Sequence, residues 1–188
     1  MRLSSFVPAV MLAAALTAGA TPVVYTLSGN FTGTLGSTSF INDPGTFSFT
    51  GDTSTATSGG LFHYNTVGTG TFSLAGDGTA TFLSSTFGAE SQANAGGFYD
   101  SATDFGLGAQ SGAFAGYDLT GPIGPITGPF IFNGAYPELT SRGDLTITGE
   151  TGNTTFTATT PAPEPSSIAL LGSGLLGFAA SLRRRFKQ

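Results

Sequence analysis

The chain contains no cysteine, no tryptophan and a single histidine, His63. Without cysteine no disulfide can form, so any folded domain here depends on its hydrophobic core. One histidine and no thiol exclude the common zinc ligand sets, and we expect no metal site and no cofactor. A Ser/His/Asp triad would have to use His63, which stands between Phe62 and Tyr64 in a segment typical of a strand. No G-x-S-x-G motif occurs, so we predict a structural or surface histidine and no catalytic residue.

Positive charge is equally scarce. Between residues 21 and 160 there are ten carboxylates, and Arg142 is the only basic residue. A surface this acidic repels nucleic acid, which we exclude as a partner. The carboxylates are scattered, mostly beside Gly, Thr or Asn in expected turns, where Arg142 should pair with one of them. Because the sequence does not show which carboxylates meet in space, a carboxylate-based hydrolase stays open as the least favoured alternative.

Long apolar runs are missing except at the two ends. The run from Ser166 to Leu182 carries no charge and, as a helix, would be roughly 26 Å long, the short end of what spans a bilayer. Its large apolar residues point in all directions, which predicts a single transmembrane helix and argues against an amphipathic core helix. A basic cluster that is expected to stay cytoplasmic follows it, formed by Arg183, Arg184, Arg185 and Lys187.

Small residues recur at every fourth position of this predicted helix. They form one face on which another membrane helix could approach closely. These residues are Ala169, Ser173, Gly177 and Ser181.

Pro163, Glu164 and Pro165 stand directly before the apolar run. Residues 161–188 therefore contain a short polar motif at 163–165, a membrane-length segment at 166–182 and a basic end at 183–188, in that order. This order resembles the PEP-CTERM sorting signal of Gram-negative bacteria. The resemblance implies processing by an exosortase-type enzyme, transient anchoring in the inner membrane and delivery to the cell surface or the extracellular space. It also implies a host that makes exopolysaccharide, which keeps exopolysaccharide open as a partner.

The N-terminus has the pattern of a secretory signal peptide. Arg2 precedes an apolar stretch from Phe6 to Leu16, and the small residues Ala18 and Ala20 then frame a cleavage site. We predict a signal peptide over residues 1–20 with cleavage after Ala20. The ends therefore carry addressing signals, and residues 21–160 form the exported domain.

The exported domain has the composition of pleated sheet. All but three of the 17 phenylalanines lie in it, together with abundant threonine and glycine. From Val23 to Leu35 the large apolar residues occupy odd positions only. This period of two predicts one long strand, or two strands broken near Gly29.

Breaker residues return at short intervals along the domain. Asn42 to Gly45 is predicted to be a turn, and Gly76 to Gly78 a hairpin loop. A second hairpin is predicted about Gly152, between strands at 145–148 and 156–158. Strands at this spacing, with no helical pattern among them, predict an all-β domain, an antiparallel β-sandwich or a barrel-like fold.

Residues 89–138 are rich in Gly, Ala and Pro and predict little. Short strands are expected at Phe114–Leu119 and Phe130–Phe132, and a loop over Gly121–Ile126. The chain as a whole is predicted to be a non-enzymatic surface or matrix protein. The main alternative is a carbohydrate-binding module. Four tyrosines are candidates for a sugar platform in that case, although we expect most aromatic residues to pack in the core: Tyr64, Tyr99, Tyr117 and Tyr136.

Overall fold

A computed structural model describes residues 21–134 and 136–161 of the chain. The predicted signal peptide, the motif at 163–165, the membrane segment and the basic end all lie outside these residues. Within the described part no helix has both the length and the apolar character needed to cross a membrane.

The described residues form thirteen β-strands and two short 3-10 turns, η1 (Thr53–Thr55) and η2 (Gly112–Phe114). The strands, in chain order, are β1 (Pro22–Leu35), β2 (Thr38–Asp52), β3 (Thr57–Gly59), β4 (Phe62–Asn65), β5 (Gly68–Leu74), β6 (Gly78–Thr81), β7 (Phe87–Gln92), β8 (Ala95–Asp100), β9 (Phe105–Gln110), β10 (Ile123–Gly134), β11 (Glu138–Thr140), β12 (Gly143–Glu150) and β13 (Asn153–Thr159).

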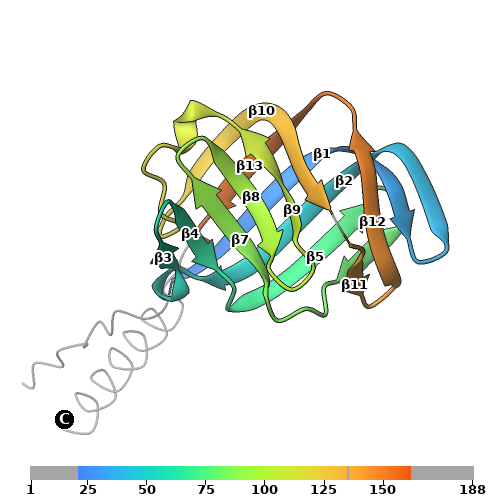
Figure 1. Ribbon diagram of the computed structural model, residues 1–188, viewed down its shortest axis with the longest axis horizontal. Coiled ribbons are helices and arrows are strands. Elements are labelled where there is room, and N and C mark those ends of the chain that lie inside the picture. The colour runs from blue at the N-terminus through green and yellow to red at the C-terminus, as the bar shows by residue number, and fades with distance from the viewer. Residues whose placement is uncertain (1–20, 135, 162–188) are drawn as a thin grey trace, which may run out of the picture.

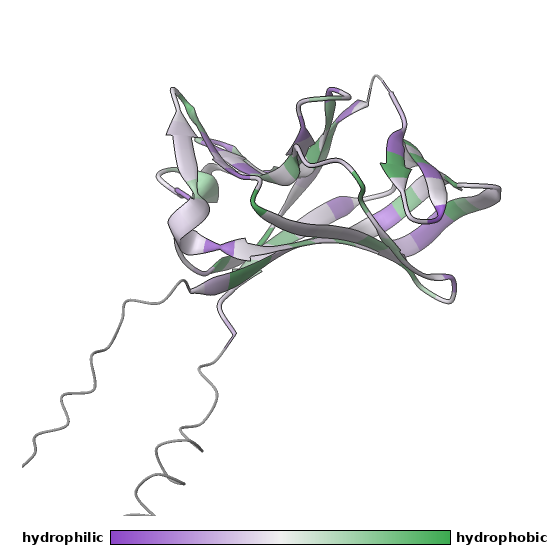
Figure 2. Ribbon diagram, turned by 90° about the horizontal axis from the view of Figure 1, so that it is seen from below, coloured by the Kyte–Doolittle hydropathy of each residue, from purple (hydrophilic) through white to green (hydrophobic). Residues whose placement is uncertain are grey.

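All strands belong to one antiparallel sheet, in the order β3-β4-β7-β8-β9-β10-β13-β1-β2-β5-β6, and β12 joins β1 and carries β11. The sheet bends back on itself, so that β7, β8 and β9 lie over β1, β2 and β5 (Figure 1). Figure 2 shows the two resulting layers from the side. The prediction of an all-β antiparallel domain is confirmed. The hydrogen-bonded path ends at β3 and β6, so the sheet is open and its two halves pack face to face.

Phenylalanine rings fill the space between the layers, and Phe47 on β2 is the central one. Its ring centroid lies 4.5 Å from that of Phe72 and 5.3 Å from that of Phe31 in its own layer. Across the core it lies 6.4 Å from Phe98. Beyond β6, Phe82 stacks on Phe87 of the opposite layer at 3.9 Å. These ring contacts join the two halves of the sheet.

The long strand predicted at Val23–Leu35 is present as β1, and its odd apolar residues are buried. The predicted hairpin about Gly152 is wrong. β13 pairs with the first half of β1 (Val24–Ser28), and β12 pairs with its second half (Phe31–Leu35). The chain therefore continues along one edge of β1 instead of turning back, because β1 is long enough to hold both strands end to end.

The predicted turn at Asn42–Gly45 is also wrong, because β2 runs through it. The register between β1 and β2 shifts there, and Asn42 adopts a positive φ of 55° while its backbone N–H donates to the Thr32 hydroxyl at 3.0 Å. The breaker residues form a β-bulge inside a strand. The predicted hairpin loop at Gly76–Gly78 is confirmed, since β5 and β6 pair across it.

The segment from residue 89 to 138 contains more sheet than its sequence predicts. The strand β7 ends in it, and β8, β9 and β10 lie entirely within it. Phe130–Phe132 is part of β10, as predicted, whereas Phe114–Leu119 contains the end of η2 and no strand. The predicted loop at Gly121–Ile126 is partly wrong, since β10 begins at Ile123.

Replacing Phe47 by Ala should destabilise the domain by about 3–5 kcal/mol, because the cavity would open at the contact between the two layers. The measurement is equilibrium urea unfolding of the exported chain. Leu61→Ala is the control, since Leu61 is 81% exposed and its loss should cost no more than about 0.5 kcal/mol. Equal, small effects of both changes would contradict the proposed core.

Candidate functional site

The outer face of the β7–β10 layer collects the side chains that are best placed to bind a ligand. Alternate residues such as Ala89, Phe98 and Leu107 point into the core, so the residues between them face outward. The strand registers align these outward positions in two rows. One row runs Tyr64, Glu90, Gly97, Gly108, Ile131. The next runs Gly88, Tyr99, Gly106, Asn133.

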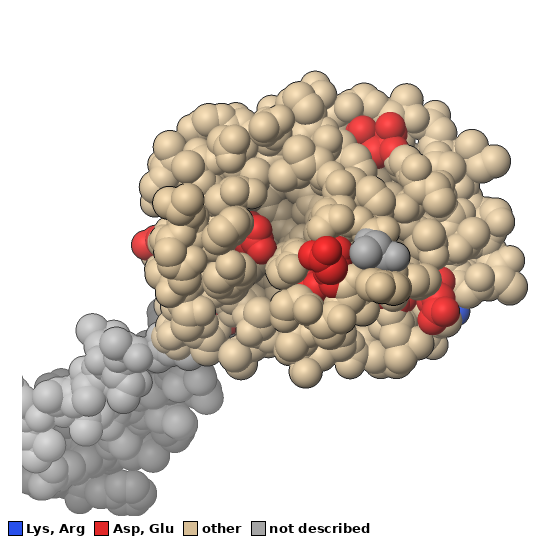
Figure 3. All heavy atoms as spheres, viewed as in Figure 1, with Lys and Arg blue, Asp and Glu red and all other residues tan. Residues whose placement is uncertain are grey.

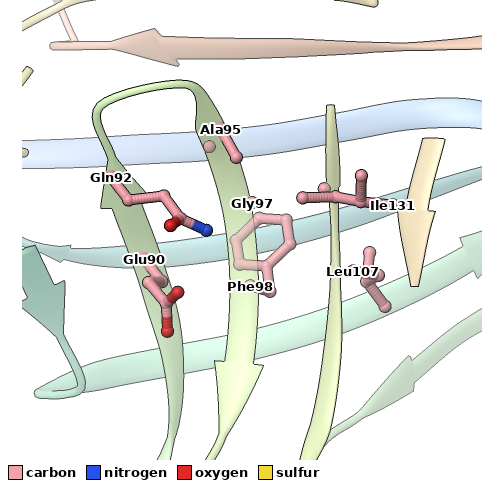
Figure 4. A pocket seen from close by; sticks show the side chains of 9 residues that line it. Glu90, Gln92, Ala95, Gly97, Phe98, Leu107 and Ile131 are labelled. Atoms are coloured by element: carbon pink, nitrogen blue, oxygen red, sulfur yellow. The ribbon is translucent and has the colours of Figure 1, made fainter. Parts of the chain in front are cut away.

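Gly97 and Gly108 occupy the middle of the first row, and Gly106 lies between Tyr99 and Asn133 in the second, so this part of the face is bare backbone between side chains. We call this hollow the Glu90 groove. It has a volume of about 250 Å³ and is lined by Glu90, Gln92, Tyr99, Gly106, Ile131, Phe132 and Asn133. Beside the groove lies a narrow recess of about 30 Å³, whose lining includes Glu90, Gln92, Gly97, Gly108 and Ile131. Figure 4 shows this recess, with Glu90 and Gln92 on β7 at one side and Ile131 on β10 at the other. The space-filling view shows a shallow hollow on this face of the molecule (Figure 3).

A second hollow adjoins the groove beside Tyr99. It has a volume of about 320 Å³ and is lined by Tyr64, Thr66, Thr86, Ala89, Tyr99 and Ser101. Tyr64 also stacks on Phe62 at a centroid distance of 6.0 Å. The Tyr99 hydroxyl donates to Asp104 Oδ1 at 3.0 Å, which limits the movement of its ring. Two aromatic rings therefore stand next to the carboxyl of Glu90.

Glycine is required at the floor by the close approach of β8 and β9. A Cβ atom on Gly97 would lie 2.0 Å from the carbonyl oxygen of Leu107. No side chain fits at that distance without a backbone shift. The same residue that brings the strands together thus leaves the recess beside the groove open.

The carboxyl of Glu90 is half-buried, and this burial raises its pKa to about 7. The hydroxyl pKa of Tyr64 is also raised, first by burial and then by the charge of Glu90. Near neutral pH Glu90 therefore exists both as an acid that donates a hydrogen bond and as a carboxylate that accepts one. The groove combines such a carboxyl with the amides of Gln92 and Asn133, tyrosine rings and a bare floor. This set suits a neutral ligand that carries hydroxyl groups.

Only two of the four tyrosines named from the sequence meet at this face. Tyr117 is buried, and its hydroxyl donates to the carbonyl of Gly121 at 3.0 Å. Tyr136 is 66% exposed and does not line the groove. The sequence signal that marks the face is the spacing of Gly97, Gly106 and Gly108.

The predicted structural histidine lies in β4, where Ser58 Oγ and His63 Nδ1 are 2.9 Å apart. In the described part of the chain no hydrogen bond or ion pair joins His63 to a carboxylate, so this pair lacks the third group of a triad. Arg142 pairs with Asp77 at 3.1 Å, which confirms the predicted role of the lone arginine.

A larger hollow, of about 540 Å³, lies on the outer face of the other layer between β1, β2 and β5. Its lining consists of Ser28, Gly29, Asn30, Pro44, Gly45, Thr46, Ser73, Leu74 and Ala75. It contains no charged and no aromatic side chain. The Glu90 groove is smaller but holds the groups that recognise ligands, so we take it as the candidate site.

The sorting residues predicted from the sequence all lie outside the described residues. They are Ala18, Ala20, Pro163, Glu164, Pro165, Ala169, Ser173, Gly177, Ser181, Arg183, Arg184, Arg185 and Lys187.

The described part thus defines an all-β protein with a ligand-sized groove on one outer face. Beyond it, residues 161–185 match the family model of the PEP-CTERM protein-sorting motif. The chain is a protein with a PEP-CTERM sorting domain, and this motif is associated with export and with handling by an exosortase at the membrane. No curated protein and no solved structure matches the chain.

Proposed function

We propose that residues 21–160 form a non-enzymatic surface or extracellular-matrix domain, which the tail delivers after transient anchoring in the inner membrane. The single observation that carries this proposal is the sorting motif at residues 161–185, directly after the last strand. In this proposal the motif directs export, and the two-layered domain is the part of the protein that is exported.

The geometry favours binding over hydrolysis. A glycoside hydrolase needs two carboxyl groups that flank the scissile bond. Among the described residues that line the groove and the hollow next to it, Glu90 is the one carboxylate, and it belongs to the groove. A site with one carboxyl, two amides and two tyrosines can hold a sugar but offers no acid–base pair.

Carbohydrate binding at the Glu90 groove is therefore the second candidate function. Tyr64 and Tyr99 offer rings for the apolar faces of sugars, and Glu90, Gln92 and Asn133 offer hydrogen bonds to hydroxyl groups. The acidic character of residues 21–160 favours a neutral polysaccharide over an anionic one. Exopolysaccharide of the surrounding matrix has the required hydroxyl groups.

The sorting proposal predicts that the motif acts separately from the membrane segment. In P163A/E164A/P165A the protein should stay exported and membrane-bound, but unprocessed at its full signal-cleaved mass. Proline disfavours a helical backbone, so we expect the motif to stay outside the predicted membrane helix, where a membrane enzyme could reach Glu164. Cell fractionation and intact mass in the native host measure this outcome.

Deletion of Arg183–Gln188 is the matched control for this experiment. It removes the basic stop and keeps the motif, so some protein should pass into the periplasm instead of staying in the membrane. If the triple-alanine protein reaches the surface at the wild-type mass, the motif is only a linker and the sorting proposal is wrong.

The carbohydrate proposal predicts that the exported chain binds neutral glycans on an array. Y64A and Y99A should each weaken binding about tenfold, since an aromatic contact contributes about 1–1.5 kcal/mol. Y136A is the matched control, because Tyr136 is exposed but lies outside the groove. No glycan binding, or equal loss in all three variants, would rule out this candidate without affecting the sorting proposal.

A further inference from the structure

Two carboxyl groups meet in the interior, away from the Glu90 groove. Asp100 ends β8 and Glu138 begins β11, and both are 0% exposed. The carboxyl of Asp100 lies close enough to Glu138 for a hydrogen bond when one of the two is protonated. This pair could not be predicted from the sequence, because the two residues are far apart along the chain and only the fold brings them together.

Each carboxyl is held by donors on one oxygen and left without a partner on the other. Asp100 Oδ1 accepts from the Thr86 hydroxyl and from the backbone N–H of Ala102, the latter at 2.8 Å. Glu138 Oε1 accepts from the Thr103 hydroxyl. Asp100 Oδ2 and Glu138 Oε2 are buried and have no hydrogen-bond partner among the described residues.

Two adjacent carboxylates buried without a counter-charge are strongly unfavourable, so a positive charge has to neutralise them. Arg142, the only basic side chain from residue 21 to 161, is engaged with Asp77. Calcium prefers six to eight oxygen ligands, and the described residues contain no group of three or more metal-ligating side chains. A proton can be held by the two carboxyl groups alone, so it is the cation that fits this pair.

We propose that Asp100 and Glu138 share one proton between Oδ2 and Oε2. The resulting hydrogen bond holds β11 against the turn between β8 and β9. The proton comes from solvent and replaces a repulsion between two buried charges by a hydrogen bond. Loss of the proton returns it to solvent and leaves two carboxylates side by side.

This hydrogen bond has a structural consequence because β11 covers an edge of the sheet. Thr140 bridges to Phe82 just after β6. The backbone N–H of Leu83 donates to the carbonyl of Leu139 at 3.0 Å, and that of Ser141 donates to the carbonyl of Thr81 at 2.8 Å. Release of β11 would expose the unpaired edge beyond β6, and exposed edges pair with other chains. The carboxyl pair thus makes the covering of this sheet edge by β11 dependent on pH.

The direction of the pH dependence follows from the site. The pKa of Glu138 is raised from 4.5 to about 7, mainly by burial; the Thr103 hydrogen bond lowers it, and the charge of Asp100 and a hydrogen bond with Asp100 raise it. Among the described residues no other charged group contributes. The folded chain therefore holds the proton more tightly than the unfolded chain. The stabilisation is complete below about pH 4.5 and is lost as pH rises through about 7.

The test is the melting temperature of the exported chain in neutral detergent between pH 5 and pH 8. The wild type should lose about 5 °C or more over this range. E138Q should lose clearly less, because its amide donates to Asp100 at every pH. D43N is the matched control, because it removes an exposed carboxylate that takes no part in the pair, and it should lose as much as the wild type. Burial also raises the pKa of Glu90 to about 7, so E90Q should remove a separate part of the loss, which should add to the effect of E138Q in the double variant.

Amide hydrogen exchange at Leu83 and Ser141, corrected for the intrinsic rate, gives a second readout. Exchange should accelerate about tenfold above pH 7 in the wild type and not in E138Q. The same pH dependence in both proteins would overturn the proposal. So would a calcium-induced rise in wild-type melting temperature at pH 8 that E138Q lacks, because a metal ion would then occupy the pair.

If E138Q does not fold, D100N serves the same purpose, because its amide retains Oδ1 and donates to Glu138. If neither variant folds, carboxyl NMR titration of the wild type decides. One carboxyl of the pair titrating near pH 7 supports the shared proton. Both titrating below pH 5 would overturn it.

Discussion

The packing of phenylalanine rings between two halves of one sheet is the interaction on which the rest of this structure depends. The domain has no disulfide and hardly any basic residues with which to form ion pairs. Phe47 packs against rings of both layers, and Phe82 stacks on Phe87 across them. Because the sheet is open, these contacts, and not hydrogen bonds around a closed barrel, hold its two halves together.

The folding of the sheet also determines where ligands can bind. Turning every large apolar residue of β7, β8 and β9 inward leaves glycines on the outside, where β8 and β9 approach closely. The bare floor next to Glu90 and Tyr99 is the result. The same folding brings Asp100 against Glu138 in the interior. One packing arrangement therefore produces both the outward groove and the buried pair, and a sorting motif associated with export follows them in the chain.

Period-two patterning predicted the strands whose buried residues are large, and the odd apolar residues of β1 are the clearest case. It failed where glycine replaces large residues, as in β8 and β9, because a glycine position carries no hydropathy signal and is read as a breaker. The bulge at Asn42 and the end-to-end placement of β12 and β13 on β1 depend on partner strands, which local sequence does not contain. For the same reason the sequence named Tyr64 and Tyr99 but not the groove, and it missed the meeting of Asp100 with Glu138.

The most direct test of this account is native-state hydrogen exchange of the exported chain in rising urea. If the phenylalanine core joins both layers into one cooperative unit, the slowest amides of β1 and β2 and those of β7, β8 and β9 should exchange through the same global opening. Their opening free energies should then agree within about 1 kcal/mol. Opening of β7–β9 at a free energy lower by more than about 2 kcal/mol would show that the layers unfold separately. That result would contradict a single core.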